Sequence, residues 1–345
     1  MLALVRELSP TAARPYHSTS TDIGVGYAPA HHGELLQGMF YDACGDLRRA
    51  LVTLPQPDLG TRATFYPSYS HGGVLGPPEL TKVRRAAMLT LRRFITHPAP
   101  AKGGRVEITS NVPRGIGMGS STSDVTATIR AVADFHGVEL TKDEVARLAV
   151  LAECASDSIM IDDRVVLFGH RDGVVLETLG HRLPPMFVIS CDTEPAARVD
   201  TLRLQPADYD DAEVAGFGVL RAALRRAVAL ADTALLGRVA TASARINERY
   251  LPKPHLEFLL RTSLRHGGCG IQVAHSGTVA GLIFDALLPD AEERVRRCAA
   301  ELAATASTTG IAIIGLIGVS ASLTGGSVIE QEDMKVMGDM EVLTR

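Results

Sequence analysis

The sequence has no tryptophan, few aromatic residues and no long apolar run. Its 345 residues are 46% hydrophobic, 5% aromatic and 21% charged. The start, Met1 to Arg6, lacks the charged-then-apolar order of a signal peptide, and no apolar stretch is long enough to span a bilayer. The composition is that of a globular protein with a sizeable core. We therefore expect a cytoplasmic protein that does not bind a membrane.

Paired cysteines and a surplus of basic residues are also missing. The five cysteines lie far apart and include no Cys-x-x-Cys pair, which argues against a disulfide framework or a zinc site. The formal net charge is −4, and the arginines are scattered along the chain. A nucleic-acid partner is therefore not expected, and a bound anion would have to be held by a local site.

A glycine-rich stretch from Val112 to Val125 indicates such a site. It reads VPRGIGMGSSTSDV, and the alternating run Gly104–Thr109 before it predicts a strand. Val125, Ile129 and Val132 have the spacing of a helix. Glycines let the backbone approach an oxyanion closely, and a helix N-terminus offers free N–H groups. The stretch predicts a phosphate cradle, with a plain structural turn as the alternative.

The residues before this stretch predict short strands and one helix. Residues 1–22 are expected to be a partly ordered leader, and a strand at 23–27 is expected to run into a polar loop at 28–38. Further predictions are strands at 51–54 and 61–66 and a helix from Pro78 to Thr96.

The residues after it predict a second half that is rich in helices. Thr141–Glu144 has capping-box spacing, and a hairpin is predicted at 165–176. Paired prolines indicate a domain boundary near 181–185. Beyond it we expect a buried strand at 186–190, then helices over 213–250 with a break near 232–237, and a helix at 256–264. Two strands joined by a turn are expected at 270–284, followed by a helix at 290–305 and an apolar segment at 311–317.

Three ordered segments resemble the signature of the GHMP kinases, the superfamily of galactokinase and the homoserine, mevalonate and phosphomevalonate kinases. Pro113–Ser121 resembles the central phosphate-binding motif, Ala28–Glu34 lies where the N-terminal motif lies, and Ala274–Phe284 resembles the third motif. More narrowly, four segments resemble the L-threonine kinases of cobalamin biosynthesis: Gly33–Gly38, Glu153–Ser158, Leu251–Pro254 and the Ala-His-Ser-Gly run from residue 274.

The resemblance implies an α+β fold of two domains with the active site between them. A ribosomal-protein-S5-like, nucleotide-binding domain is expected at 23–182, and a ferredoxin-like domain at 183–345. The implied activity is ATP-dependent phosphorylation of the side-chain hydroxyl of an amino acid, L-threonine giving O-phospho-L-threonine. The alternatives are another acceptor, such as homoserine or an amino alcohol, and a non-catalytic sensor that kept the fold. A homodimer is left open, because many such kinases are dimers.

At the nucleotide end, the resemblance assigns the glycine loop to the triphosphate of ATP. The candidate residues are Pro113, Gly115, Ile116, Gly117, Met118, Gly119, Ser120, Ser121 and Thr122. The loop lacks the Gly-Lys-Ser/Thr of a Walker motif, so backbone N–H groups and the helix dipole are expected to hold the phosphates. Ser121 is a catalytic candidate and, with Glu153, a candidate Mg²⁺ ligand. The alternatives are a plain N-cap for Ser121 and a solvated helix end for Glu153.

At the acceptor end, Asp157 matches the aspartate that acts as base in several family members. It would accept the proton of the acceptor hydroxyl, although Ser-Asp-Ser is also typical of a turn. Glu34 would meet the acceptor's ammonium, and Gln37 or a histidine its carboxylate or hydroxyl. The candidate substrate-binding residues are His32, Glu34, Gln37, Asp157, His275, Ser276 and Gly277, with a solvated turn as the alternative for the first three. No role is expected for His31, His97, His181 or His255.

Overall fold

The computed structural model describes residues 23–97, 100–197 and 207–319. The predicted leader at 1–22 and everything after residue 319 lie outside these residues. Within them the strands are β1 (Gly24–Tyr41), β2 (Leu47–Ser68), β3 (Gly73–Leu75), β4 (Gly103–Ser110), β5 (Val165–Gly169), β6 (Val174–Gly180), β7 (Met186–Asp192), β8 (Gly270–Val273), β9 (Val279–Asp285) and β10 (Ala312–Val319). The helices are α2 (Thr81–Arg93), α3 (Ser120–Phe135), α4 (Lys142–Glu153), α5 (Asp211–Leu230), α6 (Thr233–Asn247), α7 (Leu256–Arg265) and α8 (Ala291–Thr309).

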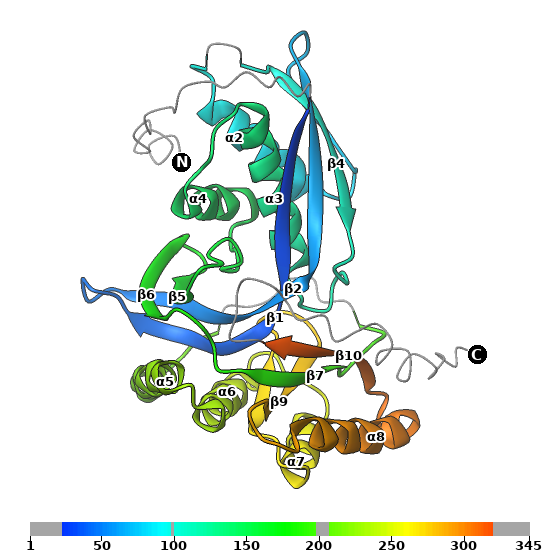
Figure 1. Cartoon of the computed structure of the whole chain (residues 1–345). Helices are drawn as coiled ribbons and strands as arrows, with labels where there is room; N and C mark the ends of the chain where they lie inside the picture. The colour runs from blue at the N-terminus through cyan, green and yellow to red at the C-terminus, as the bar shows by residue number, and fades with distance from the viewer. Residues whose placement is uncertain (1–22, 98–99, 198–206, 320–345) are drawn as a thin grey trace.

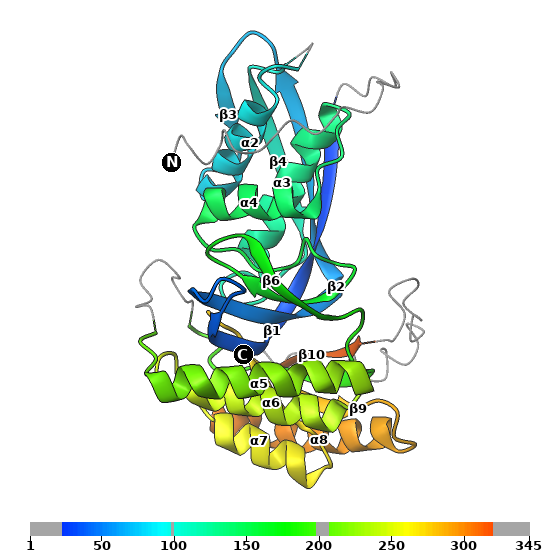
Figure 2. The ribbon, with the colours of Figure 1, turned by 90° about the vertical axis from the view of Figure 1, so that its left-hand side faces the viewer.

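All ten described strands belong to one sheet, which runs through an N-terminal and a C-terminal half of the molecule (Figure 1). The strand order is β10-β7-β9-β8-β1-β2-β4-β3, and β5 pairs with β2 and β6 off this path. Helices α2, α3 and α4 pack in the N-terminal half, and α5 to α8 in the C-terminal half (Figure 2). Every described helix is too short or too polar to cross a bilayer.

A long antiparallel ribbon of β1 and β2 connects the two halves (Figure 1). The sequence predicts a polar loop at 28–38, and this prediction is wrong, because β1 continues through these residues. The strand stays paired by shifting register between Pro29 and Ala30, between His31 and Glu34, and between Glu34 and Leu36. Such shifts bend a strand and redirect its side chains. The polar residues lie in a buried interior, so their polarity does not mark a solvated turn.

Two glycines of β1 fix the position of α3. A Cβ on Gly24 would lie 2.0 Å from the carbonyl oxygen of Ala131, and one on Gly26 would lie 2.2 Å from that of Ala127. The helix therefore lies directly on the strand backbone, which only glycine permits. This contact places the N-terminus of α3 beside the middle of β1.

The predicted helix signals are largely confirmed. Thr141 caps α4 in a capping box, in which its hydroxyl accepts from the Glu144 N–H and the Glu144 carboxylate accepts from the Thr141 N–H. The long helical region divides into α5 and α6 near the expected break, with Ala231 in a left-handed conformation. The helix expected at 78–96 is shorter, since α2 spans Thr81–Arg93.

Within the described part of the sheet, the strands of the C-terminal half join β1 through one backbone pairing with β8. Glu34 of β1 pairs with Val273 of β8, and this pair makes the sheet continuous across the molecule. A small apolar cluster lies beside it and combines both halves; its buried members are Ala30, Val112, Ile116, Met118, Ala274 and Val279. The domain boundary at residues 182 and 183 stays a prediction.

Candidate active site

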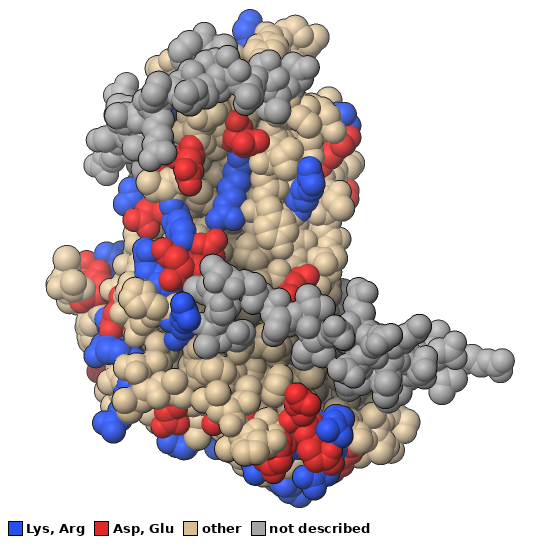
Figure 3. All heavy atoms as spheres, viewed as in Figure 1, with Lys and Arg blue, Asp and Glu red and all other residues tan. Residues whose placement is uncertain are grey.

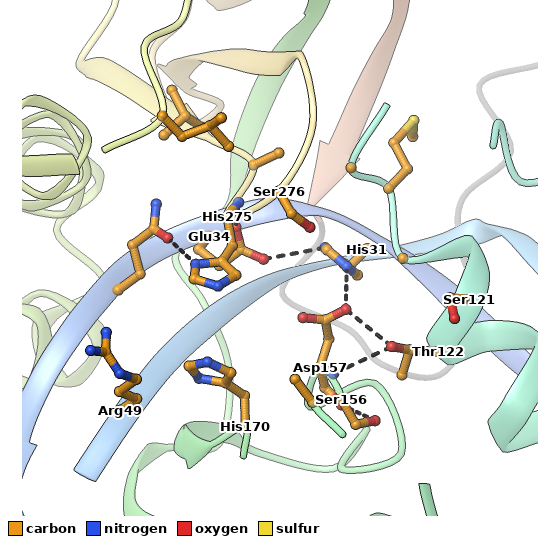
Figure 4. Close-up of a pocket in the computed structure, with 18 of the residues that line it drawn as sticks. His31, Glu34, Arg49, Ser121, Thr122, Ser156, Asp157, His170, His275 and Ser276 are labelled. Atoms are coloured by element: carbon orange, nitrogen blue, oxygen red, sulfur yellow. Dashed lines mark hydrogen bonds and ion pairs between the residues drawn. The ribbon is translucent and has the colours of Figure 1, made fainter. Parts of the chain in front are cut away.

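A cavity of about 500 Å³ is lined by residues from both halves. The glycine loop and the start of α3 form one end, as Figure 4 shows by the position of Ser121 and Thr122. Asp157 lies in the middle, and Glu34, His275, His170 and Arg49 form the other end. The sequence segments predicted for nucleotide and acceptor therefore meet in one space.

The glycine loop takes its shape from three left-handed residues. Gly115, Gly117 and Gly119 have φ of 78°, 93° and 73°, values that side chains with a Cβ rarely adopt. Gly119 is the N-cap of α3, so the free N–H groups of the first turn follow it directly. A Cβ on Gly119 would also lie 2.1 Å from His31 Cδ2. Both the close contact with His31 and the left-handed backbone conformation require glycine at position 119. This favours a phosphate cradle over a plain turn.

The third motif supports this loop from the C-terminal half. The N–H groups of Thr278 and Val279 both donate to the carbonyl oxygen of Ile116, at 2.9 and 3.1 Å. Gly277 packs on the loop, where a Cβ would lie 2.2 Å from that oxygen, and it does not line the cavity. Pro113 and Ile116 also lie outside the lining, whereas Gly115 and residues 117–122 form part of it. Ile116 and Gly277 therefore support the loop from outside the cavity, and Pro113 lies outside the lining as well.

Ser121, Glu153 and Lys82 form a connected group at the phosphate end. Ser121 Oγ donates to Glu153 Oε2 at 2.8 Å, and Lys82 Nζ donates to Ser121 Oγ at 3.1 Å. Glu153 is 6% exposed, and its Oε1 has no hydrogen-bond partner among the described residues. Burial raises the pKa of Glu153 to about 7, against the opposing charge of Lys82. Glu153 is therefore buried and is not a solvated residue at a helix end. Ser121 lies within α3, after the N-cap Gly119, and its hydroxyl contacts Glu153, so it is not a plain N-cap.

Asp157 is held between β1 and α3. Its Oδ2 lies 2.9 Å from His31 Nε2 and accepts from Thr122 Oγ1 at 3.2 Å (Figure 4). Burial disfavours a charged imidazolium, but the charge and hydrogen bond of Asp157 outweigh it and raise the pKa of His31 to about 9. Burial likewise opposes the Asp157 carboxylate, and the His31 charge holds its pKa well below the usual range. Both shifts favour an ion pair between the two residues.

Glu34 is the buried acid of the acceptor end. It is 2% exposed, and its Oε2 accepts from the backbone N–H of His275. Its Oε1 has no hydrogen-bond partner in the described chain and lies 3.7 Å from His31 Nδ1. Burial raises the pKa of Glu34 to about 8, against the charge of His31. An unpartnered buried oxygen is costly unless a ligand supplies the missing donor.

The predicted Gln37 and His275 lie next to Glu34 and contact each other. His275 Nδ1 is 2.6 Å from Gln37 Oε1, and its ring lies 5.1 Å from that of His170. Burial lowers the pKa of His275 to about 4 and that of His170 to about 3, so both rings are neutral at pH 7. Ser276 follows in the same loop and also lines the cavity.

The prediction that His32 contacts the acceptor is wrong. Its side chain is fully buried, with Nε2 2.5 Å from Ser190 Oγ and Nδ1 against the amide of Gln272. Successive side chains of a strand point to opposite faces, so only one of two neighbouring histidines can face the cavity. His31, which receives no role from the sequence, is the one that does.

Comparisons with known proteins agree with this geometry. Residues 81–169 match the model of the GHMP kinases N terminal domain. The L-threonine kinase of Citrobacter freundii is 29% identical over 279 residues, which cover 76% of this chain and 87% of that protein. The homoserine kinase of Cytophaga hutchinsonii superposes with a TM-score of 0.61 at 16% identity, over 89% of this chain and 97% of that chain. The mevalonate kinase of Staphylococcus aureus superposes with a TM-score of 0.56 at 18% identity, over 87% of this chain and 99% of that chain.

The chain carries a GHMP kinase N-terminal domain and is similar to kinases of this superfamily over most of its length. The predicted family and the predicted α+β fold are thus confirmed. The match to the family model spans α2 to β5 and includes the glycine loop. Members of this superfamily phosphorylate small molecules, and the similar proteins differ in the acceptor that their names state. The choice of acceptor must therefore be argued from the cavity.

Several polar residues that line the cavity were not among the residues predicted from sequence patterns: Arg49, Lys82, His170, Arg171, Tyr209, Asn247 and Lys253. Most stand in segments that resemble ordinary helix or turn surfaces. Lys253 is different, because it lies in one of the segments that resemble L-threonine kinases. In the described part of the face that Figure 3 shows, basic and acidic side chains are interspersed, so a bound anion depends on these local groups.

The His31 and Asp157 ion pair makes stability depend on pH. The folded pKa of His31, about 9, exceeds its unfolded value of 6.5. The pair therefore stabilises the fold fully between pH 3.8 and pH 6.5, the unfolded pKa values of Asp157 and His31, and this contribution is lost as the pH rises through 9. We expect His31→Gln to cost on the order of 2 kcal/mol near pH 6 and much less at pH 9.5. Urea unfolding of both proteins across this pH range measures the difference.

The matched control is His71→Gln, on the exposed turn after β2. It should leave the pH dependence of unfolding as in the wild type. Parallel stability curves for the wild type and His31→Gln would show that His31 is not charged in the fold. Asp157 and Glu34 are the acids that lie next to His31, so both must be intact in this comparison.

Proposed function

We propose that this protein is an ATP-dependent kinase that phosphorylates the side-chain hydroxyl of a hydroxy amino acid, with L-threonine as the preferred acceptor. The observation that carries the proposal is the position of Asp157, between the glycine loop and the buried acid Glu34. An acceptor bound at Glu34 would have its hydroxyl near Asp157 and facing the loop. The likeness to L-threonine kinases over most of the chain supports this choice above homoserine.

In this mechanism Asp157 receives the proton of the acceptor hydroxyl. The hydroxyl oxygen bonds to the γ-phosphorus, the bond from that phosphorus to the bridging oxygen breaks, and ADP leaves with the electron pair. A carboxylate with a lowered pKa is a weak base. It takes the proton late, when the hydroxyl has become acidic by bonding to phosphorus. His31 keeps Asp157 ionised and fixes its orientation through the 2.9 Å contact.

The residues at the phosphate end fit a magnesium ion. Glu153 offers the unpartnered Oε1, and Ser121 offers a hydroxyl beside it, which is the oxygen chemistry that Mg²⁺ prefers. When bound, the ion would neutralise charge on the β- and γ-phosphate oxygens. Lys82 lies 3.8 Å from Glu153 Oε2 and offers its ammonium to a phosphate on the same side. The backbone of residues 117–120, which lines the same end of the cavity, would donate to the remaining oxygens.

An acceptor panel tests the proposal. The protein is incubated with Mg-ATP and, separately, L-threonine, L-serine, L-homoserine, mevalonate and (R)-1-amino-2-propanol, while ADP release is followed. We expect the highest kcat/KM with L-threonine, and O-phospho-L-threonine as the product in ³¹P NMR. Equal ADP release with and without every acceptor would favour a sensor. A preference for L-homoserine would reassign the acceptor.

A further inference from the structure

Lys253 is a buried cation that neither the family model nor the proposed chemistry uses. It lies in Leu251-Pro-Lys-Pro254, the connection between α6 and α7, and is 4% exposed although it lines the cavity. Prolines on both sides restrict the backbone, and the Lys253 N–H is fixed by donating to Glu248 Oε1 at 2.7 Å. The side chain is thus held at one place in the wall.

The ammonium of Lys253 has donors to spare. Within the described residues its hydrogen-bond acceptor is the carbonyl oxygen of Leu251, at 3.2 Å, whereas an ammonium offers three donors. Burial lowers the pKa of Lys253 to about 8, opposed by the charges of Glu248 and Glu34. A buried cation without an adequate partner is unfavourable, and an anion that enters the cavity would remove this cost.

Glu34 is the complementary group. Glu34 and Lys253 line the same cavity, and no ion pair joins these two described residues, so neither satisfies the other. Glu34 also keeps Oε1 without a partner. An α-amino acid carries its ammonium and its carboxylate on one carbon. A buried acid that ionises when a cation enters the cavity and a buried ammonium in the same wall match that arrangement.

We propose that Lys253 and Glu34 form a subsite for an α-amino carboxylate, with Lys253 Nζ binding the carboxylate and Glu34 Oε1 the ammonium of the acceptor. The inference rests on the proposed function and extends it to Lys253. Arg49 and Arg171 are the other cations at this end of the cavity. Arg49 Nη2 donates to the carbonyl oxygen of Ala207 at 2.5 Å and its guanidinium lies over the Tyr209 ring, so groups of the C-terminal half hold it in place. Arg171 is exposed, in the turn after β5.

The test compares acceptors that lack one charge each. The Kd values of L-threonine, (R)-1-amino-2-propanol without the carboxylate, and (R)-3-hydroxybutyrate without the ammonium are measured by calorimetry with a non-hydrolysable ATP analogue bound. We expect the wild type to prefer L-threonine to aminopropanol by about 10- to 100-fold, the range of a hydrogen bond to a charged group. Lys253→Met should reduce this ratio to within about threefold. Glu34→Gln should reduce instead the preference for L-threonine over hydroxybutyrate.

This crossed pattern separates recognition from folding, because a damaged fold weakens all three acceptors together. Lys253→Gln, which keeps a donor for Leu251, is the second variant. Lys142→Met, at an exposed ion pair with Asp162, is the control and should keep the wild-type ratios. Absence of L-threonine turnover by the wild type would overturn the proposed function itself. Turnover with an undiminished preference in both Lys253 variants, or a preference lost only in Arg49→Met, would overturn the subsite alone.

Discussion

Replacing Asp157 with asparagine is expected to lower kcat about 10³-fold and to leave the Kd for ATP within about threefold. General-base groups contribute on the order of 10² to 10⁴ in rate, and the amide cannot take a proton. Asparagine has the size of aspartate and keeps a partner for Thr122 Oγ1, so the start of α3 should not move. Single-turnover kinetics with L-threonine and calorimetry with ATP measure the two quantities.

The control for this prediction is Asp46→Asn, in the exposed turn between β1 and β2. It should retain wild-type kcat. Because His31 and Asp157 act as one pair, the double variant with His31→Gln should lose less than the product of the two single losses. A fall in kcat of less than tenfold in Asp157→Asn would mean that Asp157 only positions the acceptor and that the proton leaves by another route.

The parts of the fold that follow from local rules were predictable. The glycine loop can be recognised in the sequence because Gly115, Gly117 and Gly119 occupy left-handed backbone positions, where a residue with a side chain would be strained. The start of α4 is encoded within four residues by its capping box. The likeness to a family then supplied the order of the motifs, which spacing alone does not give.

The β1 segment was not predictable, because its polarity has a long-range cause. His31, Glu34 and Gln37 have the composition of a turn, yet they are paired to β2 and buried against β8 and the loop after it. A buried polar cavity and a solvated turn look alike in a single sequence. The choice between His31 and His32 depends on register shifts that only the paired strand defines.

The same limit explains the missing cations. Lys82 lies 39 positions from Ser121 in the chain, and Lys253 is more than 200 positions from Glu34. Each becomes meaningful only when the sheet brings α2, α3 and the α6–α7 connection to one cavity. Glu153 shows the same limit, since a glutamate at a helix end leaves a metal ligand and a solvated residue as alternatives until its burial is known.

Replacing Glu153 with glutamine is expected to raise the Kd for ATP in the presence of Mg²⁺ by at least tenfold and to lower kcat by about 10²-fold. The amide keeps the acceptor for Ser121 Oγ but removes the charge that would hold a divalent cation. ATP binding without Mg²⁺ should change little or improve, because a negative charge beside the phosphates is gone. Calorimetric titrations with ATP, with and without Mg²⁺, measure this difference directly.

Two variants sharpen the interpretation. Ser121→Ala should weaken Mg-ATP binding in the same direction but less strongly, because it removes a neutral oxygen and leaves the carboxylate in place. Glu139→Gln, in the exposed loop before α4, is the matched control and should leave both ATP titrations unchanged. If Glu153→Gln weakened ATP equally with and without Mg²⁺, Glu153 would act by positioning Lys82 rather than as a metal ligand, since the 3.8 Å contact between them is the other interaction that this substitution alters.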